Sequence, residues 1–194
     1  MPKVKFDPDK FTRVTEVLRG AGLIDLTPIR PDVLERAQKF GTAVHKATEL
    51  DDKNDLAMDT VDAPLIPYLE AWKKFKADYK VSFKPEEIEQ PVYSLRWKFK
   101  GTPDRWPIYI NNKLILLDIK STTTIMPSVA IQMAAYQIAW EEMTKQRIKE
   151  RWCIQLTPDG YKIEPYKNES DKSVFLAALT VYNFRKERGL LKNA

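Results

Sequence analysis

The chain has 194 residues, of which 43% are hydrophobic and 30% charged, which is ordinary for a soluble globular protein with its own core. Its formal net charge of +5 is compatible with a polyanionic partner but identifies none, because many unrelated proteins are equally basic. A single cysteine, Cys153, excludes an internal disulfide and favours a reducing, intracellular location. No apolar run approaches the roughly 18 residues of a membrane helix, so no membrane partner is expected.

The first half of the chain is predicted to be mainly helical. Apolar residues recur at helical spacing over residues 11–20, 32–50 and 64–79. The acidic stretch that follows the second of these segments, beginning with Asp51 and Asp52, is predicted to be a polar loop.

The period then changes from helical to strand-like. Residues 89–99, 101–110 and 113–120 are typical of three successive strands, which would form a meander. Asn111 and Asn112 suit a tight turn between the last two strands, because asparagine tolerates left-handed backbone conformations.

The second half adds a helix over residues 128–147, a hairpin over 152–157 and 161–166, and a final helix. This order predicts an α/β fold in which helices flank a central mixed β-sheet, made of the three-stranded meander plus added strands. Because the sequence has no internal repeat and no low-complexity linker, residues 1–194 are predicted to form a single domain.

Two carboxylates and a lysine form the most informative pattern in the sequence. Asp104 comes one hairpin ahead of Asp118, and Lys120 follows two residues later, so Asp118 and Lys120 share one face of a strand. The apolar run before them indicates a central strand, where charged side chains are costly to bury without a function. Metal-dependent phosphodiester hydrolysis uses such groups, because acids hold divalent cations and a lysine orients water or neutralises the phosphate.

Structural explanations for the same residues remain open at this point. Asp104 follows a glycine and a proline and could cap a turn. Lys120 could be only the ion-pair partner of Asp118. His45, the single histidine of the chain, could lie on a helix surface or in the core, although a neutral imidazole is also a common metal ligand.

Further motifs surround this pattern. Pro103-Asp104 followed by Asp118-Ile119-Lys120 resembles the Pro-Asp…Asp-x-Lys pattern of the PD-(D/E)xK nuclease superfamily. Three further motifs are similar, in order, to those of its RecB-like exonuclease branch, which includes compact exonucleases of phages and of mitochondrial genome maintenance. They are Gly41-x-x-x-His45, Gly101-x-x-Asp104 and Gln132-x-x-x-Tyr136. The resemblance covers roughly residues 13–140.

This resemblance implies a restriction-endonuclease-like core and a metal-dependent deoxyribonuclease that uses Mg²⁺ or Mn²⁺. His45, Asp104 and Asp118 would hold one cation together with the backbone carbonyl of Ile119, and two cations would stabilise the attacking and leaving oxygens. The iron–sulfur cluster of some relatives is not expected, because the chain has one cysteine.

A glutamate near the start of the first strand would complete the second metal site. Glu89 is the residue that we assign to this role, but Glu86 and Glu87 are close neighbours and leave the register open. A solvated acidic strand end is the structural alternative for all three.

The resemblance also implies residues that contact nucleic acid. Gln132 and Tyr136 are four residues apart, so they share one helix face, and the family places this pair against the DNA strand. Ser121 and Thr122 directly follow the lysine, where hydroxyl groups could bind phosphate or could belong to a polar loop.

The sequence therefore predicts a DNA exonuclease that hydrolyses phosphodiester bonds from a free single-stranded or duplex end, with Asp104, Asp118 and Lys120 as catalytic residues. A structure-specific endonuclease or junction resolvase, and a DNA-binding module that does not cleave, are the alternatives. We expect a role in DNA repair or recombination, with a helicase or recombination protein as partner. The expected location is the cytoplasm, of a bacterium or of the host cell of a phage.

Overall fold

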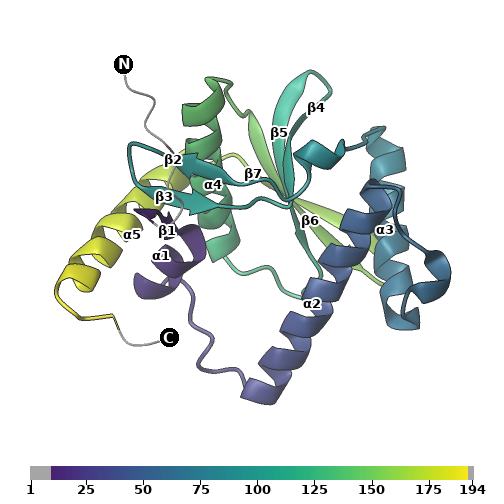
Figure 1. Cartoon of the computed structure of the whole chain (residues 1–194), viewed down its shortest axis with the longest axis horizontal. Helices are drawn as coiled ribbons and strands as arrows, with labels where there is room; N and C mark the ends of the chain where they lie inside the picture. The colour runs from purple at the N-terminus through teal and green to yellow at the C-terminus, as the bar shows by residue number, and fades with distance from the viewer. Residues whose placement is uncertain (1–9, 192–194) are drawn as a thin grey trace.

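The computed structural model describes residues 10–191, and the two ends of the predicted domain, 1–9 and 192–194, lie outside the described residues. Within the described residues, three of the five α-helices precede β2, the fourth lies between β5 and β6, and the fifth follows β7 (Figure 1). The helices are α1 (Val14–Gly20), α2 (Pro31–Asp52), α3 (Ile66–Tyr79), α4 (Ser128–Thr144) and α5 (Ser170–Glu187). Three short 3₁₀ turns, η2 (Met58–Thr60), η3 (Ala63–Leu65) and η4 (Pro85–Glu87), lie between α2 and the first long strands.

The larger sheet has four strands in the order β4-β5-β6-β7. Its strands are β4 (Arg105–Ile110), β5 (Lys113–Lys120), β6 (Glu150–Thr157) and β7 (Gly160–Tyr166). β5 and β6 are parallel and are connected through α4, whereas the other two pairs are antiparallel. The sheet is therefore mixed, and the predicted α/β class with a mixed sheet flanked by helices is confirmed.

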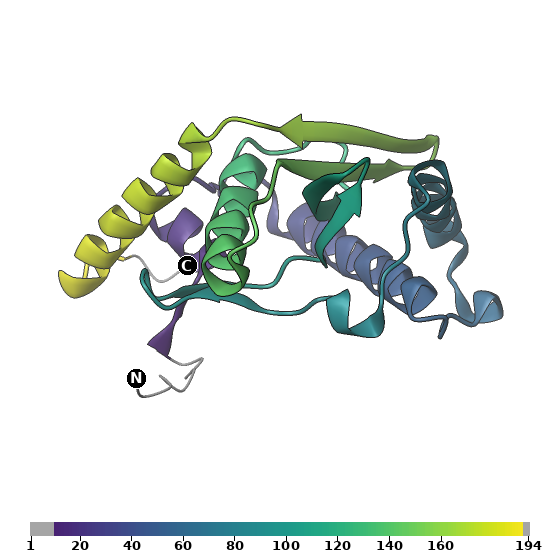
Figure 2. The same ribbon diagram turned by 90° about the horizontal axis from the view of Figure 1, so that it is seen from above.

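The smaller sheet has three short strands in the order β1-β3-β2. They are β1 (Thr12–Arg13), β2 (Val92–Ser94) and β3 (Phe99–Gly101), with β1 parallel and β2 antiparallel to β3. α4 contacts both sheets and lies between them, as the view from above shows (Figure 2).

The predicted three-stranded meander is wrong in its pairing. Residues 92–101 form the β2–β3 hairpin of the smaller sheet, so that of the predicted meander only β4 and β5 belong to the larger sheet. Lys98 lies in the turn of that hairpin and has a positive φ of 57°. The turn was not predicted because the residues on both sides of it have high strand propensity. One isolated bridge, between Ile88 and Arg105, links the segment before β2 to β4.

The two faces of β5 pack against different helices. Leu114 and Leu116 belong to the core cluster built with α1, α4 and α5. Ile115, Leu117 and Ile119 alternate with them and belong to the cluster built with α2 and α3. Burial on both faces explains the unbroken apolar run in the sequence and confirms that this strand is central.

Several predicted local features agree with the structure. Asn111 and Asn112 form the β4–β5 turn with φ angles of 48° and 61°. The first helix begins three residues later than predicted, because Thr12 and Arg13 pair with β3 instead. Within residues 10–191, no helix is both long and apolar enough to cross a membrane.

Candidate functional site

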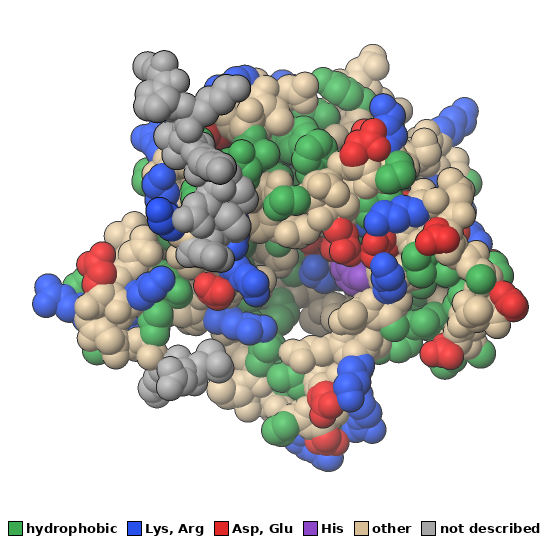
Figure 3. Space-filling view, in the orientation of Figure 1, with side chains coloured by type: hydrophobic (Ala, Val, Ile, Leu, Met, Phe, Trp, Pro, Cys, Tyr) green, Lys and Arg blue, Asp and Glu red, His purple; other side chains and the backbone are tan. Residues whose placement is uncertain are grey.

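The carboxylate of Asp104 connects two elements that are distant in sequence. Its Oδ1 atom lies 3.0 Å from Nδ1 of His45 on α2, and its Oδ2 atom accepts a hydrogen bond of 2.7 Å from the backbone N–H of Ile119 on β5. Asp104 directly precedes β4, whose first residue, Arg105, is the register partner of Leu117 on the antiparallel strand β5. The imidazole is visible in purple in a hollow of the surface, beside acidic and basic side chains (Figure 3).

Asp118 and Lys120 lie at the end of β5, on the face that carries Leu114 and Leu116. Asp118 is 2% exposed, and its Oδ2 atom forms an ion pair with Nζ of Lys120. Nζ of Lys120 also lies 3.3 Å from the carbonyl oxygen of Ile119. The ion pair that the sequence left open is therefore present, and it lies beside the Asp104 carboxylate.

The charges of these four side chains strongly perturb one another. Burial alone would raise the pKa of Asp104, but His45, Lys120 and the amide of Ile119 outweigh it, and the pKa lies well below its usual range. Burial, aided by repulsion from Asp104, raises the pKa of Asp118 despite its contact with Lys120. The Asp104 carboxylate raises the pKa of His45 against the effect of burial.

Lys120 is held as a cation in this arrangement. Burial alone would lower its pKa, but the carboxylates of Asp118 and Asp104 outweigh that effect and raise the pKa above its ordinary value. Two carboxylates, an ammonium group and an imidazole therefore form a compact, nearly neutral cluster in a partly dehydrated position.

The acidic segment before β2 contacts Asp104 through a backbone hydrogen bond. The N–H of Glu89 donates a 3.1 Å hydrogen bond to the carbonyl oxygen of Asp104, and Glu89 has an exposed side chain and a φ of 50°. Glu89 thus lies in a bend three residues before β2, not at the start of a strand as predicted. Glu86 and Glu87 lie in η4, where the carboxylate of Glu87 accepts from the N–H of Lys84.

The two polar residues after Lys120 lie in different surroundings, and only Ser121 is next to the site. Ser121 lies next to α2: its Oγ atom would be 3.7 Å from a Cβ atom added to Gly41. Gly41 and His45 share one helix face, so Ser121 is near the site. Thr122 is exposed, and its hydroxyl donates to the carbonyl oxygen of Thr124 within the loop.

Gln132 and Tyr136 form a pair on α4, as their spacing predicts. Nε2 of Gln132 donates a 2.8 Å hydrogen bond to the hydroxyl oxygen of Tyr136, which is 4% exposed. Burial raises the pKa of Tyr136, and the charge of Asp118 adds to this effect, so the hydroxyl stays protonated. The ring packs on Gly101, where an added Cβ atom would lie only 2.2 Å from a ring carbon.

A buried ion pair next to the site was not predicted from the sequence. The Arg105 side chain is 1% exposed, and its Nε and Nη2 atoms each lie 2.7 Å from Oδ2 of Asp52 on α2. Nη1 of Arg105 donates to the carbonyl oxygen of Asp104, also at 2.7 Å. Asp52 additionally accepts from Trp72 and from Lys76.

This arrangement overturns the prediction that Asp51 and Asp52 lie in a polar loop. Both are in the last turn of α2, and the Asp52 side chain is fully buried. His45 and Asp52 are seven residues apart and therefore lie on one helix face, two turns from each other. One face of α2 thus holds both Asp104 and the residue that follows it, and this i, i+7 spacing was the available sequence signal.

The donor atoms suit a hard divalent cation, although the described residues do not form a ready ligand cluster. Carboxylate and carbonyl oxygens with one imidazole are the ligands that Mg²⁺ and Mn²⁺ accept. Nδ1 of His45 faces Asp104, so Nε2 is the ring nitrogen that could bind a metal ion while this contact is kept. Among residues 10–191, no three histidine, cysteine, aspartate or glutamate side chains are grouped closely enough to hold a metal ion.

We expect Asp52→Asn to lower the free energy of unfolding by about 3–5 kcal/mol, because it leaves the buried Arg105 guanidinium without its counter-charge. Urea unfolding measures the change. Asp55→Asn is the matched control, since Asp55 is exposed and should change stability by less than about 0.5 kcal/mol. Equal effects of the two substitutions would contradict the assigned ion pair.

Two glycine substitutions should change stability in opposite directions. Gly101→Ala is expected to cost about 1–3 kcal/mol, because the new methyl group collides with the Tyr136 ring. Gly41→Ala should stabilise the protein by up to about 1 kcal/mol, because it lies inside α2 with no contact below 3.7 Å. Thermal unfolding of both variants tests the packing, and a neutral Gly101→Ala would refute it.

Comparisons with known proteins identify the fold and no more. No protein-family model matches the sequence, and no curated protein matches it. A crystal structure of a "putative exonuclease" from Eubacterium rectale has a TM-score of 0.55 and 11% identity, covering 99% of this chain and 88% of that one. A crystal structure of SSO0001 has a TM-score of 0.44 and 14% identity, covering 92% and 78% of the two chains. The chain shares the fold of the Eubacterium rectale protein over nearly its whole length.

Proposed function

We propose that this protein is a metal-dependent nuclease that hydrolyses DNA phosphodiester bonds from a free end. One observation carries the proposal: Asp104 and Asp118, with Lys120, meet at the ends of two neighbouring strands beside His45. Buried charges of this kind lower the stability of a protein, and they are therefore found mainly where a function requires them. The Eubacterium rectale protein, which has the same fold, is described as a "putative exonuclease", and this supports the proposal.

The proposed cofactor is Mg²⁺ or Mn²⁺. Asp104, Asp118 and the carbonyl oxygen of Ile119 would hold it, with His45 as a nitrogen ligand and Glu89 as the acid of a second position. When bound, such a cation supplies Lewis-acid activation of water and neutralises charge that develops on the phosphate.

Lys120 has two tasks in this proposal. In the metal-free protein its ammonium group balances the charge of Asp118, which avoids an isolated buried carboxylate. Beside a phosphodiester, the same ammonium group would orient the attacking water and stabilise negative charge on the phosphate oxygens. In the metal-free protein the carboxylates of Asp118 and Asp104 raise the pKa of Lys120 against the effect of burial, so the group is an ammonium donor there.

The surrounding polar residues would position the DNA strand. The Gln132–Tyr136 pair presents a protonated hydroxyl and an amide near Asp118, and both groups can bind phosphate or sugar oxygens. Ser121 would contribute a hydroxyl from the loop next to α2, whereas Thr122 would have to give up its hydrogen bond to Thr124. A helicase or recombination protein remains the proposed partner, with action in the cytoplasm.

Digestion of end-labelled linear DNA beside covalently closed circles, with Mg²⁺, Mn²⁺ or EDTA, tests the proposal. We expect loss of the linear substrate alone, and only with metal. Nicked or linearised circles would instead indicate an endonuclease. DNA binding without cleavage under any metal would contradict the nuclease and favour a binding module.

Lys120→Gln and Asp118→Asn should each lower the cleavage rate by at least about 10²-fold, because they remove a cation and a ligand from the reacting centre. Single-turnover cleavage of the linear DNA measures the loss. Lys162→Gln, an exposed lysine on β7, is the control and should be as active as the wild type. Wild-type rates in both site variants would remove these residues from the mechanism.

His45→Gln should change which metal supports activity. Loss of the imidazole removes a nitrogen ligand, which Mn²⁺ accepts more readily than Mg²⁺ does. We therefore expect the activity with Mn²⁺ to fall more steeply than that with Mg²⁺ in a titration of each metal. Unchanged dependence on both ions would exclude His45 as a ligand.

A further inference from the structure

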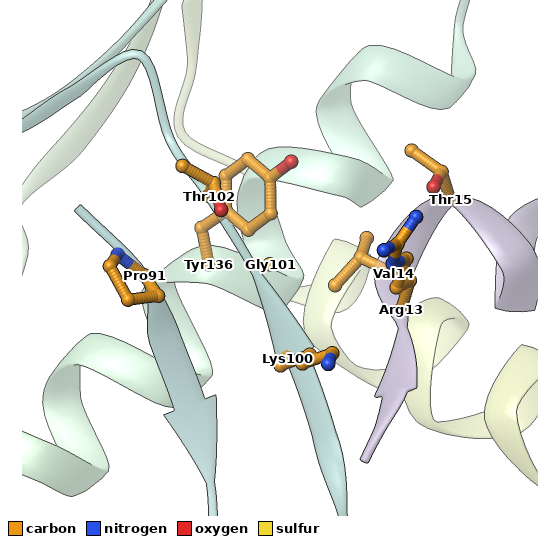
Figure 4. A pocket seen from close by; sticks show the side chains of 8 residues that line it. All are labelled: Arg13, Val14, Thr15, Pro91, Lys100, Gly101, Thr102 and Tyr136. Carbon is orange, nitrogen blue, oxygen red and sulfur yellow. The ribbon is translucent and has the colours of Figure 1, made fainter. Parts of the chain in front are cut away.

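A hollow of about 470 Å³ opens next to the proposed site, on the side of the smaller sheet. Its walls come from β1, β3 and the start of α1, and from Tyr136 on α4 (Figure 4). Tyr136 and Gly101 belong both to this hollow and to the motifs of the site, and Asp104 lies three residues beyond Gly101. The hollow therefore adjoins the motifs of the site through these two residues.

The lining of this hollow is cationic and rich in hydroxyl groups. Arg13 and Lys100 are register partners on the parallel strands β1 and β3. In Figure 4 the Lys100 side chain extends from β3 toward β1, and Thr15 and Thr102 lie near the other end of the hollow. No acidic side chain is among its lining residues within the described part of the chain.

A second hollow of about 440 Å³ adjoins the first, because Arg13 and Lys100 line both. Lys10 and Lys186 add two further cationic side chains, against the single carboxylate of Glu16. An oxygen atom of Glu16 lies 3.9 Å from Nε of Arg13, and both side chains are more than half exposed. Among the described lining residues of the two hollows, four side chains are cationic and one is acidic, a balance that favours a polyanionic ligand.

The wall between these hollows and the site is rigid. The Tyr136 ring contacts Gly101 so closely that no side chain fits between them, and the Tyr136 hydroxyl is fixed by Gln132. The opposite wall is held by the β1–β3 pairing and by a hydrogen bond from the N–H of Thr12 to the carbonyl oxygen of Lys98. A preformed hollow loses little conformational entropy when a ligand enters.

We infer that this hollow binds a phosphate group of the DNA strand that enters the site. An arginine and a lysine with nearby threonine hydroxyls are the donors that phosphate oxygens accept, and arginine can bind phosphate through two parallel hydrogen bonds. Tyr136 and Pro91 give the hollow flat apolar walls for the attached sugar or base. The inference rests on the proposed function and adds to it a subsite whose charged residues, Arg13 and Lys100, belong to none of the motifs.

Binding of a fluorescent single-stranded oligonucleotide, followed by anisotropy with EDTA present, tests the inference without any cleavage. Arg13→Ala should weaken binding roughly tenfold and lower the slope of log affinity against log salt by about 0.7, because one phosphate contact is lost. Arg13→Lys should keep the slope. Glu16→Gln should tighten binding, since it removes the one carboxylate among the described lining residues.

Lys162→Ala is the charge-matched control, because Lys162 is an exposed lysine on β7 of the larger sheet. Binding by Arg13→Ala that equals that of Lys162→Ala in affinity and salt slope would overturn the inference. Competitor strands with a 5′-phosphate, a 3′-phosphate or only hydroxyl ends identify the source of the phosphate. Selective loss of one end preference would mean a terminal phosphate, and equal loss for all strands an internal one.

The binding measurement tests the phosphate subsite separately from the proposed nuclease activity. Cleavage by the wild type together with unchanged binding by Arg13→Ala would refute the subsite and leave the nuclease intact. Weakened binding by Arg13→Ala without cleavage by the wild type would support the subsite in a protein that binds DNA and does not cut it.

Discussion

The arrangement of the site depends on the two hydrogen-bonding contacts of the Asp104 carboxylate. One oxygen faces His45 on α2 and the other accepts from the amide of Ile119, the residue between Asp118 and Lys120. A single side chain therefore sets the position of α2 relative to the end of β5. The neighbouring Arg105 repeats this connection two helical turns away, through Asp52 and the Asp104 carbonyl oxygen. Because Arg105 is fully buried, the position of Asp104 is fixed on both its backbone and its side chain.

The electrostatics of the cluster follow from this geometry. Two carboxylates near one another cannot both remain charged in a dehydrated position without compensation. Lys120 and His45 provide that compensation, and it is unequal because Asp104 contacts both the imidazole and the amide of Ile119, whereas Asp118 contacts Lys120. Asp104 is stabilised as an anion by three partners, whereas Asp118 depends mainly on Lys120. A divalent cation would offer both acids a stronger partner than an ammonium group, and it would release Lys120 toward a substrate.

The sequence predicted the parts of this structure that depend on local spacing. Alternation along a strand placed Asp118 and Lys120 on one face, and the i, i+4 spacing paired Gln132 with Tyr136. The α/β class and most helices followed from apolar periodicity. Strand pairing was predicted less well, because β2 and β3 have the propensities of sheet strands but close on themselves and recruit β1 from far away in sequence. Asp52 was misassigned because its burial depends on Arg105, 53 residues later, and only its i, i+7 spacing from His45 indicated that burial locally. The contact between His45 and Asp104 was expected only from a family resemblance, since their separation in sequence carries no geometric information.

We propose that Asp104 and Asp118, held at adjacent strand ends, bind a divalent cation. The most direct measurement is a titration of the DNA-free protein with Mn²⁺, followed by electron paramagnetic resonance of the unbound ion, for the wild type and for Asp104→Asn. We expect saturable binding by the wild type and its loss in the variant, with the fold retained. Absence of saturable binding by the wild type, or equal binding by both proteins, would contradict it.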